Sequence, residues 1–455
     1  MTGKGGSWAL IAALAGFLFG FDTAVISGAE QAVQQVWSMS DALHGLAISS
    51  ALWGTVAGAL VGGWPSDRWG RRPTLIAIGV FYAISAIGSA LAWGPASFIV
   101  FRVLGGIAIG ISSVTAPAYI AEISPREQRG RLVALFQAMI VFGILVAFFS
   151  NYLLGGLGAH GWRWMLGVVA LPSLAYLVVT FSIPESPRWL LVQAGREDNA
   201  RTILSQINPE TVDETLEAIV QEAAGDSQTL TWRQFFSGDL RRPILLAFMI
   251  ALFNQLSGIN AIIYYAPRIF EMTGIGVSTA LLATVGIGVI NLVFTLAGMA
   301  LIDRAGRKFL MYVGSIGYIV SLSMTAWGFA SGQFGMVLPF IFAFIAAHAI
   351  GQGAVIWVYI SEVFPSAARA KGQSLGAGTH WVCAAVLTQA MPIILSQMAP
   401  AAIFAGCAAL MVLQLVWVHF AMVETSGRSL EDVASELSVS RVRFFRSNMG
   451  SGRDR

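Results

Sequence analysis

Twelve long apolar segments dominate the sequence, and each is long enough to cross the hydrocarbon core of a bilayer as an α-helix of about 20 residues. They cover residues 8–29, 45–64, 73–93, 97–120, 131–154, 163–183, 243–265, 277–302, 309–331, 335–360, 372–397 and 400–423. Of the 455 residues, 56% are hydrophobic and only 11% are charged, against about 25% charged residues in a soluble protein. The sequence therefore predicts an all-α membrane protein with twelve transmembrane helices. It disfavours a secreted domain, a nucleic-acid binder and a soluble enzyme.

A polar stretch separates the apolar segments into two sets of six. Residues 184–242 contain ten acidic residues and six arginines, together with apolar residues at helical spacing. We therefore expect an N-terminal six-helix bundle at 1–183 and a C-terminal six-helix bundle at 243–430. Between them we expect a cytoplasmic linker with short amphipathic helices at 184–242, and after them a cytoplasmic tail at 431–455.

The basic residues predict the orientation of the helices. If the first segment begins in the cytoplasm, 24 of the 27 lysines and arginines lie on the cytoplasmic side, and only Arg102, Arg163 and Arg268 do not. Loops rich in lysine and arginine stay on the cytoplasmic side of a membrane. We expect a multi-pass protein of the inner membrane with both termini in the cytoplasm.

Three short motifs occur once in each half of the chain, in the same order and at offsets of 236, 240 and 239 residues. The pairs are Asp67-Arg-Trp-Gly-Arg-Arg72 with Asp303-Arg-Ala-Gly-Arg-Lys308, Glu122-Ile-Ser-Pro with Glu362-Val-Phe-Pro, and Glu185-Ser-Pro-Arg188 with Glu424-Thr-Ser-Gly-Arg428. Transporters are often built from duplicated halves. The repeated motifs indicate such an internal duplication.

On these motifs the chain resembles the sugar porter family of the major facilitator superfamily, over nearly its whole length. The resemblance is carried by Asp67-Arg-Trp-Gly-Arg-Arg72, Pro184-Glu-Ser-Pro-Arg-Trp189, Asn254-Gln-Leu-Ser-Gly-Ile-Asn260 with Tyr264-Tyr265 after it, and Trp357 leading into Ser361-Glu-Val-Phe-Pro365. It implies two pseudo-symmetric six-helix bundles with the substrate site between them near the middle of the membrane. It also implies transport of a sugar by alternating access from the two sides.

Asp22 lies in the middle of the first apolar segment, where an ionised carboxylate costs several kcal/mol unless it is paired or protonated. Arg102, near the start of the fourth segment, is the cation that can pair with it. Separating the two would leave an isolated buried acid, which takes up a proton because burial disfavours the charged form. We therefore predict a proton switch at Asp22 with Arg102 as its counter-ion. A static structural ion pair is the alternative.

Several amides lie inside apolar segments, where they can replace water as partners of sugar hydroxyls. By resemblance, the sugar-contacting positions of the family are Gln137, Gln255, Asn260, Asn291 and Trp357. Asn254 stands where the family commonly has a glutamine, and its shorter side chain leaves room for a larger pocket or for water. The C–H faces of a sugar ring can lie against aromatic side chains, for which the candidates are Tyr264, Trp357 and Trp381. The alternative role of the amides is to join helices by hydrogen bonds.

Two histidines extend the predicted substrate site. His348 and His380 fall where the animal fructose transporter is similar to this sequence, whereas Trp357 is similar to the glucose and xylose carriers. The substrate signal is therefore mixed, and we expect a hexose or a pentose, with fructose among the candidates. The alternative role of each histidine is that of a packing residue.

A further group of charges lies at the cytoplasmic ends of the helices. Acids and arginines there can pair between neighbouring helices and favour closure of the inner face. By resemblance they form the cytoplasmic gate of the family, which comprises Arg71, Arg72, Glu122, Arg129, Glu185 and Arg188 in the first half and Arg307, Glu362, Arg369, Glu424 and Arg428 in the second. The alternative, that the arginines only mark the topology, does not explain the repeated glutamates.

Together these features predict proton-coupled symport of a monosaccharide. The alternatives are a facilitative uniporter, in which Asp22 is merely structural, and a non-transporting sugar sensor. The glycine-rich stretch 105–110 lies inside an apolar segment and is no phosphate loop, and the sequence has no Walker motif, metal cluster or nucleophile triad. We expect no enzymatic activity, no metal and no cofactor. The expected partners are the monosaccharide, the proton and the lipid bilayer but no nucleic acid, and we expect the chain to work as a monomer.

Glycines recur at every fourth position in two of the apolar segments. Gly54, Gly58 and Gly62 form one stripe, and Gly106 and Gly110 form another. Such stripes let neighbouring helices approach closely. We expect the second and fourth segments to pack tightly in the bundle.

Overall fold

The computed structural model describes residues 4–125, 128–225, 230–236, 238, 240–428, 432–433 and 436–437. This described part is helical, without a β-strand. Twelve helical spans in it are long and apolar enough to cross a membrane, and they overlap the twelve apolar segments of the sequence. The predicted all-α membrane fold is therefore confirmed. The predicted tail, 431–455, lies almost wholly outside the described residues.

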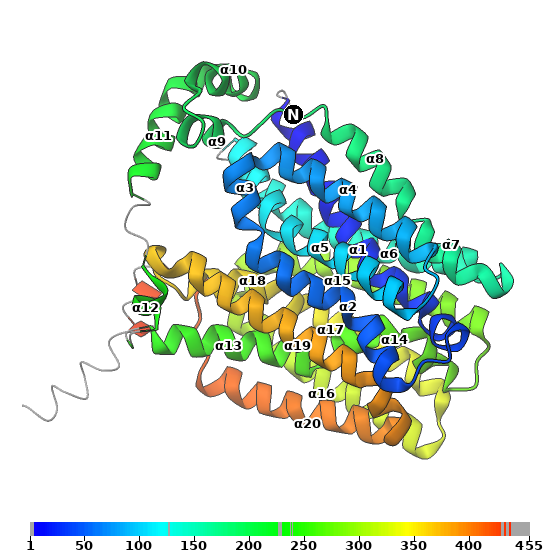
Figure 1. Ribbon diagram of the computed structural model, residues 1–455. Coiled ribbons are helices and arrows are strands. Elements are labelled where there is room, and N and C mark those ends of the chain that lie inside the picture. Colours follow the sequence, from blue (N-terminus) through cyan, green and yellow to red (C-terminus); the bar gives the residue numbers. More distant parts are fainter. Residues whose placement is uncertain are drawn as a thin grey trace, which may run out of the picture.

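The first six spans make up one bundle, coloured from blue to blue-green in Figure 1. Its helices are α1 (Gly5–Val36), α2 (Asp41–Val61), α3 (Gly63–Trp69), α4 (Arg71–Ala90), α5 (Pro95–Ile123), α6 (Arg129–Leu154), η1 (Gly158–His160), α7 (Gly161–Gly167) and α8 (Ala170–Thr180). The short α3 extends the second span, and η1, α7 and α8 together form the sixth.

The last six spans make up the second bundle, coloured from green to orange in Figure 1. Its helices are α13 (Arg241–Leu256), α14 (Ile259–Glu271), α15 (Val277–Ala305), α16 (Arg307–Ser331), η4 (Phe334–Met336), α17 (Val337–Ile350), α18 (Gln352–Glu362), η5 (Ser366–Ala368), α19 (Arg369–Gln397) and α20 (Pro400–Phe420). The pairs α13 with α14 and α17 with α18 each form one broken span.

Short helices lie between the bundles in the sequence: α9 (Pro187–Val192), α10 (Glu197–Ile207), η2 (Pro209–Thr211), α11 (Val212–Gly225) and α12 (Trp232–Phe235). In α9, Trp189 donates from its indole nitrogen to the Asp67 carbonyl at 2.7 Å, which holds α9 against the first bundle. In α12, Phe235 stacks on Phe364 at 5.6 Å between ring centroids, which holds α12 against the second bundle. The linker is thus divided between the two bundles.

Two spans of the second bundle are broken at glycines. Gly258, between α13 and α14, has a φ of +84°, a left-handed conformation that favours glycine. Gly351, between α17 and α18, lies so close to α16 that an added side chain would meet the backbone of Gly314 at 2.7 Å. Broken helices are typical of transporter substrate sites, because they free backbone and side-chain polar groups inside the membrane.

Glycines also set the close spacing of α2 and α5 in the first bundle. A methyl group at Gly58 would collide with the carbonyl oxygen of Ile107, and one at Gly106 would collide with that of Ala51. The two glycine stripes therefore pack against each other, which confirms the expected tight packing of these segments.

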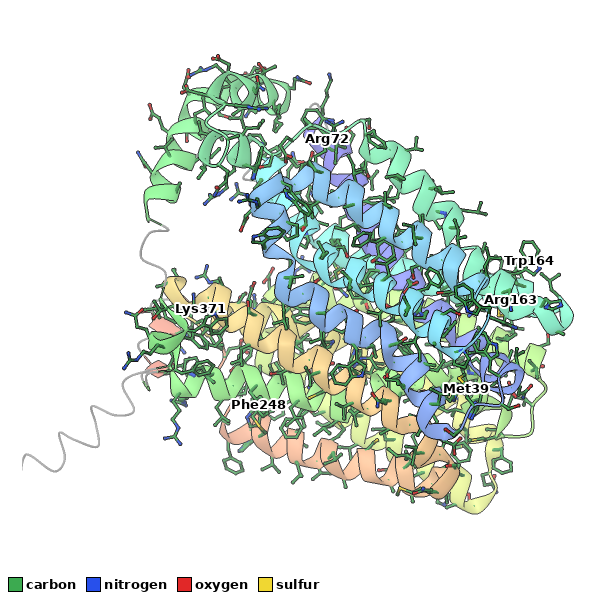
Figure 2. All side chains as sticks on the ribbon, viewed as in Figure 1. Met39, Arg72, Arg163, Trp164, Phe248 and Lys371 are labelled. Atoms are coloured by element: carbon green, nitrogen blue, oxygen red, sulfur yellow. The ribbon has the colours of Figure 1, made fainter. Side chains whose placement is uncertain are left out.

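The two bundles make side-chain hydrogen bonds to each other at the end of the molecule opposite the linker helices. Figure 2 labels residues at both ends: Arg72 and Lys371 at the linker end, and Met39, Arg163 and Trp164 at the opposite end. Near the opposite end, Trp53 of α2 donates to Gln389 Oε1 of α19 at 2.8 Å. At the linker end, by contrast, α9 and α12 lie on different bundles (Figure 1).

Candidate functional site

A buried ion pair joins the middle of α1 to the first half of α5. Arg102 Nη1 donates to Asp22 Oδ1 at 2.8 Å, and Arg102 Nη2 donates to the Asp22 backbone carbonyl at 3.3 Å. The two side chains are only 1% and 3% exposed. The second carboxylate oxygen, Asp22 Oδ2, has no hydrogen-bond partner among the described residues. The structure thus brings Asp22 and Arg102 together and leaves one carboxylate oxygen unbonded.

The surroundings of the Asp22 carboxylate reach across to the second bundle. A methyl group at Gly105 would lie 2.4 Å from the Ser85 hydroxyl oxygen and 3.6 Å from Asp22 Oδ2, so the glycine lets α5 lie close to both groups. Tyr264, from α14 of the second bundle, is 1% exposed and lies near enough to Asp22 and Arg102 to interact with both electrostatically. The ion pair therefore borders the interface between the bundles.

Gln255, near the end of α13, is the centre of a polar cluster in the second bundle. Its Oε1 accepts from Asn260 Nδ2 at 2.7 Å, and its Nε2 donates to Asn254 Oδ1 at 2.9 Å. The same Nε2 lies 3.2 and 3.3 Å from the two ring nitrogens of His380. Gln255 and Asn254 are buried, whereas Asn260 and His380 are half-buried. Four of the predicted substrate residues thus lie in one hydrogen-bonded cluster.

Aromatic rings adjoin this cluster. The His380 ring contacts those of Trp357 and Trp381, with ring centroids at 5.0 and 4.7 Å. Phe19 of α1 reaches across from the first bundle to Trp381, with ring centroids at 5.6 Å. Since Phe19 precedes Asp22 by one helical turn, α1 contacts both the ion pair and the aromatic side of the cluster.

The remaining predicted substrate residues lie on three other helices. Gln137 is half-buried on α6, and Asn291 is buried on α15, where its Oδ1 accepts from Thr295 at 3.3 Å. On α17, the ring nitrogen Nδ1 of His348 is hydrogen-bonded to the Tyr318 hydroxyl at 2.6 Å. Contact of these residues with a sugar stays a prediction.

Arg71 organises the charges at the linker end of the first bundle. Its Nε and Nη2 each donate to the Glu122 carboxylate at 3.0 Å, and its Nη1 donates to Asp67 at 3.0 Å. Glu185 accepts from the backbone N–H groups of Arg71 and Arg72 at 2.9 and 3.2 Å. These contacts join α4, α5 and the segment after α8 within one bundle.

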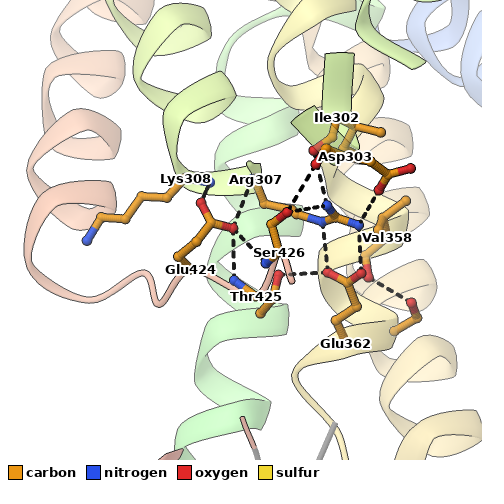
Figure 3. Close-up of polar contacts among 10 residues, drawn as sticks. Ile302, Asp303, Arg307, Lys308, Val358, Glu362, Glu424, Thr425 and Ser426 are labelled. Carbon is orange, nitrogen blue, oxygen red and sulfur yellow. Dashed lines mark hydrogen bonds and ion pairs between the residues drawn. The ribbon is translucent and has the colours of Figure 1, made fainter. Parts of the chain in front are cut away.

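Arg307 makes the matching contacts in the second bundle, which Figure 3 shows. Its Nε and Nη2 donate to Glu362 at 3.1 and 2.9 Å, and Nη2 also donates to Asp303 at 3.0 Å. Glu424 accepts from the backbone N–H groups of Arg307 and Lys308, both at 2.9 Å. The repeated motifs therefore form the same hydrogen bonds in both halves.

The two matched glutamates differ in how easily they take up a proton. Burial raises the pKa of Glu185 above its ordinary value, and the backbone N–H donors around it do not offset the effect. Burial acts in the same direction on Glu424, but more donors oppose it, so that the pKa of Glu424 is lowered. Those donors are the backbone N–H groups of Ser426, Lys308, Arg307 and Thr425.

The other predicted gate residues lie on or near the ends of further helices. Arg129 is exposed at the start of α6, and Arg188 is half-buried on α9. Arg369 donates to the Ser366 hydroxyl at 3.3 Å, and Arg428 pairs with Glu436. Within the described ranges the gate pairs join helices of the same bundle, and none of these pairs spans the two bundles.

One ion pair that the sequence did not reveal does span the bundles. Arg268 of α14 donates from Nε and Nη2 to the two carboxylate oxygens of Glu30 on α1, at 2.9 and 2.7 Å, and Nη2 also donates to Gln34 at 2.7 Å. His44 of α2 lies 3.2 Å from the same carboxylate, and the Glu30 side chain is fully buried. The sequence offers one indication of this pair, because Arg268 is one of the three basic residues that the predicted topology places outside the cytoplasm.

Comparisons with known proteins give the family. Residues 8–437 match the family model described as "Sugar (and other) transporter". The chain is 36% identical over 430 residues to the arabinose-proton symporter of Bacillus subtilis, which covers 93% of this chain and 92% of that protein. This chain belongs to the sugar porter family of the major facilitator superfamily. This sugar porter is also 35% identical to the D-xylose transporter of Levilactobacillus brevis, over 93% of this chain and 94% of that one.

A solved structure extends the likeness of this sugar porter to its three-dimensional fold. The inward open conformation of the xylose transporter XylE from E. coli matches it with a TM-score of 0.85 at 30% sequence identity, over 94% of this chain and 99% of that chain. The match covers both bundles and the segment between them. This sugar porter is therefore a multi-pass membrane protein with the major facilitator fold.

Proposed function

We propose that this sugar porter couples the entry of a monosaccharide to the entry of protons across the inner membrane, with both termini in the cytoplasm. The observation that carries the proposal is the buried pair of Asp22 and Arg102. An acid at this depth keeps its charge only beside a cation, and it takes up a proton when the two separate. Because α1 and α5 each contribute one partner, movement between these helices alternates the two states.

The sugar site lies at the cluster of Gln255, Asn260, His380, Trp357 and Trp381. Amide donors and acceptors replace the water around the sugar hydroxyls, and the indole rings cover the C–H faces of the sugar ring. Tyr264 and Phe19 connect this cluster to the ion pair in the other bundle. We expect a pentose or a hexose, in keeping with relatives that are named for arabinose and xylose.

The contacts between the bundles support alternating access. Hydrogen bonds at Arg268 and Gln389 hold the bundles together on the non-cytoplasmic side. Together with the likeness to an inward open structure, this supports an inward-facing arrangement. The chain works as a monomer, because both sites lie within its own two bundles.

Proton coupling can supply the energy for accumulation. One charge that crosses 100 mV releases about 2.3 kcal/mol, which supports a sugar gradient of roughly fifty-fold. Asp22→Asn cannot exchange a proton, so it is expected to abolish uphill uptake into energised proteoliposomes. Counterflow of labelled sugar needs no net proton movement, and it should persist in this variant.

The controls separate the coupling from the transport itself. A protonophore should reduce wild-type uptake to the level of equilibration, and accumulation that survives it would show uniport or another energy source. Full uphill uptake by Asp22→Asn would contradict the assigned role of that residue. Competition among xylose, arabinose, glucose, galactose, fructose and inositol identifies the sugar. Gln255→Ala should weaken the binding of that sugar by roughly 10-fold, because a hydrogen bond in a desolvated site is lost.

A further inference from the structure

A continuous chain of buried side chains leads away from the sugar cluster into the second bundle. Asn260 donates to Gln255 and Gln255 donates to Asn254, as described above. Asn254 Nδ2 then donates to Gln352 Oε1 at 3.3 Å, Gln352 Nε2 to Gln414 Oε1 at 3.0 Å, and Gln414 Nε2 to Ser315 Oγ at 2.8 Å. The chain thus runs through α14, α13, α18, α20 and α16.

The far end of the chain determines its direction. The Ser315 hydroxyl donates its only hydrogen to the Met311 carbonyl of its own helix at 2.7 Å. Since a carbonyl oxygen can only accept, Ser315 Oγ must accept from its other neighbour. Gln414 must therefore turn its NH2 group to Ser315 and its carbonyl to Gln352. Each amide of the chain must likewise turn its NH2 group toward the Ser315 end and its carbonyl oxygen toward the Asn260 end.

The members remote from the sugar cluster are sealed inside the protein. Gln352, Gln414 and Ser315 are each 0% exposed. A buried amide without a partner costs free energy, so flipping any one of them would place two donors or two acceptors face to face. Gln352 also occupies the first position of α18, directly after the break at Gly351. The chain is therefore tied to the broken span beside the sugar cluster.

We propose that Ser315, Gln414 and Gln352 are positioning residues that fix which way the sugar-binding amides point; this rests on the proposed sugar site. The direction of the chain commits Gln255 Oε1 to Asn260 and Asn260 Nδ2 to Gln255. Asn260 Oδ1 is left as an acceptor on a half-buried residue. The site consequently selects a sugar hydroxyl that donates a hydrogen bond at this point.

The test compares variants of two buried serines on the same helix. Ser315→Ala removes the acceptor that ends the chain. Ser321→Ala is the matched control, because Ser321 is also buried on α16 and donates to its own helix, at Gly317, but is not part of the chain. Gln414→Met breaks the chain at a second point with a side chain of similar length. Ser315→Thr keeps the hydroxyl, which in a helix also bonds a preceding carbonyl.

The probe is the sugar with the lowest KM among D-xylose, L-arabinose, D-glucose and D-fructose, together with its monodeoxy and monodeoxyfluoro analogues. We expect Ser315→Ala and Gln414→Met to raise KM by about 10-fold with the maximal rate within about twofold of wild type, because the amides are present but no longer oriented. Ser315→Thr should restore KM, and Ser321→Ala should not change it. A fluorine accepts but cannot donate, so the wild type should discriminate against one fluoro analogue, and Ser315→Ala should lose that discrimination.

A wild-type KM in Ser315→Ala or Gln414→Met would overturn the positioning role while leaving the sugar site intact. So would a raised KM with an unchanged pattern of analogue discrimination, which would show general destabilisation. Absence of uptake of all four sugars by the wild type would instead refute the proposed function, and the positioning role would fall with it. Should Gln414→Met not fold, the comparison of Ser315→Ala with Ser321→Ala and Ser315→Thr decides the question.

Discussion

Replacing Glu30 by glutamine is expected to release the two bundles from each other at the end opposite the linker helices. Glu30 belongs to α1 of the first bundle and Arg268 to α14 of the second, so the pair exists only while these helix ends lie together. The substitution Glu30→Gln keeps the length of the side chain and one acceptor oxygen but removes the charge. It therefore weakens the contact between α1 and α14 and, with it, the proposed inward-facing state, and inside the first bundle it changes only the contact with His44.

The size of the effect follows from the geometry of the pair. Two charge-assisted hydrogen bonds of 2.9 and 2.7 Å join the side chains. Removing one partner of a buried ion pair costs about 3 to 5 kcal/mol. Arg268 is 19% exposed and keeps its hydrogen bond to Gln34, so the lower value of about 3 kcal/mol applies. That corresponds to a change of roughly 150-fold in the ratio of inward-facing to outward-facing molecules.

Double electron–electron resonance can measure this ratio. Trp93 and Met398 lie after the C-terminal ends of α4 and α19, one on each bundle, and are 80% and 47% exposed. Spin labels at Trp93→Cys and Met398→Cys, in a chain with Cys383→Ala and Cys407→Ala, report the separation of the bundles at this end. The main population of Glu30→Gln should show a longer distance between the two labels than the main population of the wild type.

The matched control is a weaker contact between the same two helices. Gln31 of α1 donates to Glu271 of α14 at 3.1 Å, and both residues are half-buried. Glu271→Gln keeps an acceptor there, so it should change the ratio by less than about fivefold, equivalent to about 1 kcal/mol. A distance distribution in Glu30→Gln that matches the wild type, or an equal change in Glu271→Gln, would show that the pair of Glu30 and Arg268 does not hold the bundles together.

Three further outcomes are expected. Gly106→Leu should lower the thermal stability of the detergent-solubilised protein, because any side chain there collides with Ala51 of α2, whereas Gly406→Leu on α20 should not, since nothing lies within 4 Å of that position. On acidification Glu185 should take up a proton before Glu424, because the pKa of Glu185 is raised above its ordinary value and that of Glu424 is lowered below it. Infrared difference spectra, assigned with the two glutamine variants, measure this order. The opposite order would contradict the prediction. At pH 7, Glu424→Gln should lower the melting temperature more than Glu185→Gln, because of the two carboxylates it is that of Glu424 whose charged form the fold favours. The contribution of Glu424 to the free energy of unfolding is present above its ordinary pKa and is lost as the pH falls through the lowered value.

The helical spans could be predicted from the sequence because they depend on a local property. About 20 apolar residues in a row must form a helix inside a bilayer, whatever the neighbouring helices are. The matching contacts of Arg71 and Arg307 could also be predicted from the sequence, because the same motifs occur in both halves of the chain. The pairing of Asp22 with Arg102 was accessible for another reason: a buried acid needs a cation, and the sequence offers few.

The contacts that the sequence did not reveal depend on partners far apart in the chain. Glu30 comes directly after the first apolar segment, at 8–29, and reads as an ordinary charge at a helix end. Only the packing of α1 against α14 shows that it is fully buried and paired. Gln352 and Gln414 are likewise single amides in apolar helices, 62 residues apart. Nothing in their local sequence distinguishes a hydrogen-bonded chain from separate contacts between helices.

The two bundles of this sugar porter share one set of contacts and differ in two others. The contacts at the linker end occur in both halves, as the predicted internal duplication implies. The ion pair of Asp22 belongs only to the first bundle, and the amide chain from Asn260 to Ser315 belongs only to the second. Under the proposed function, coupling between proton and sugar has to cross the interface between the bundles. Helix α1 is suited to this, because within 12 residues it carries Phe19 against Trp381, Asp22 against Arg102, and Glu30 against Arg268. Under the proposed function, a shift of α1 when Asp22 is protonated would reach the sugar site and the non-cytoplasmic contact together.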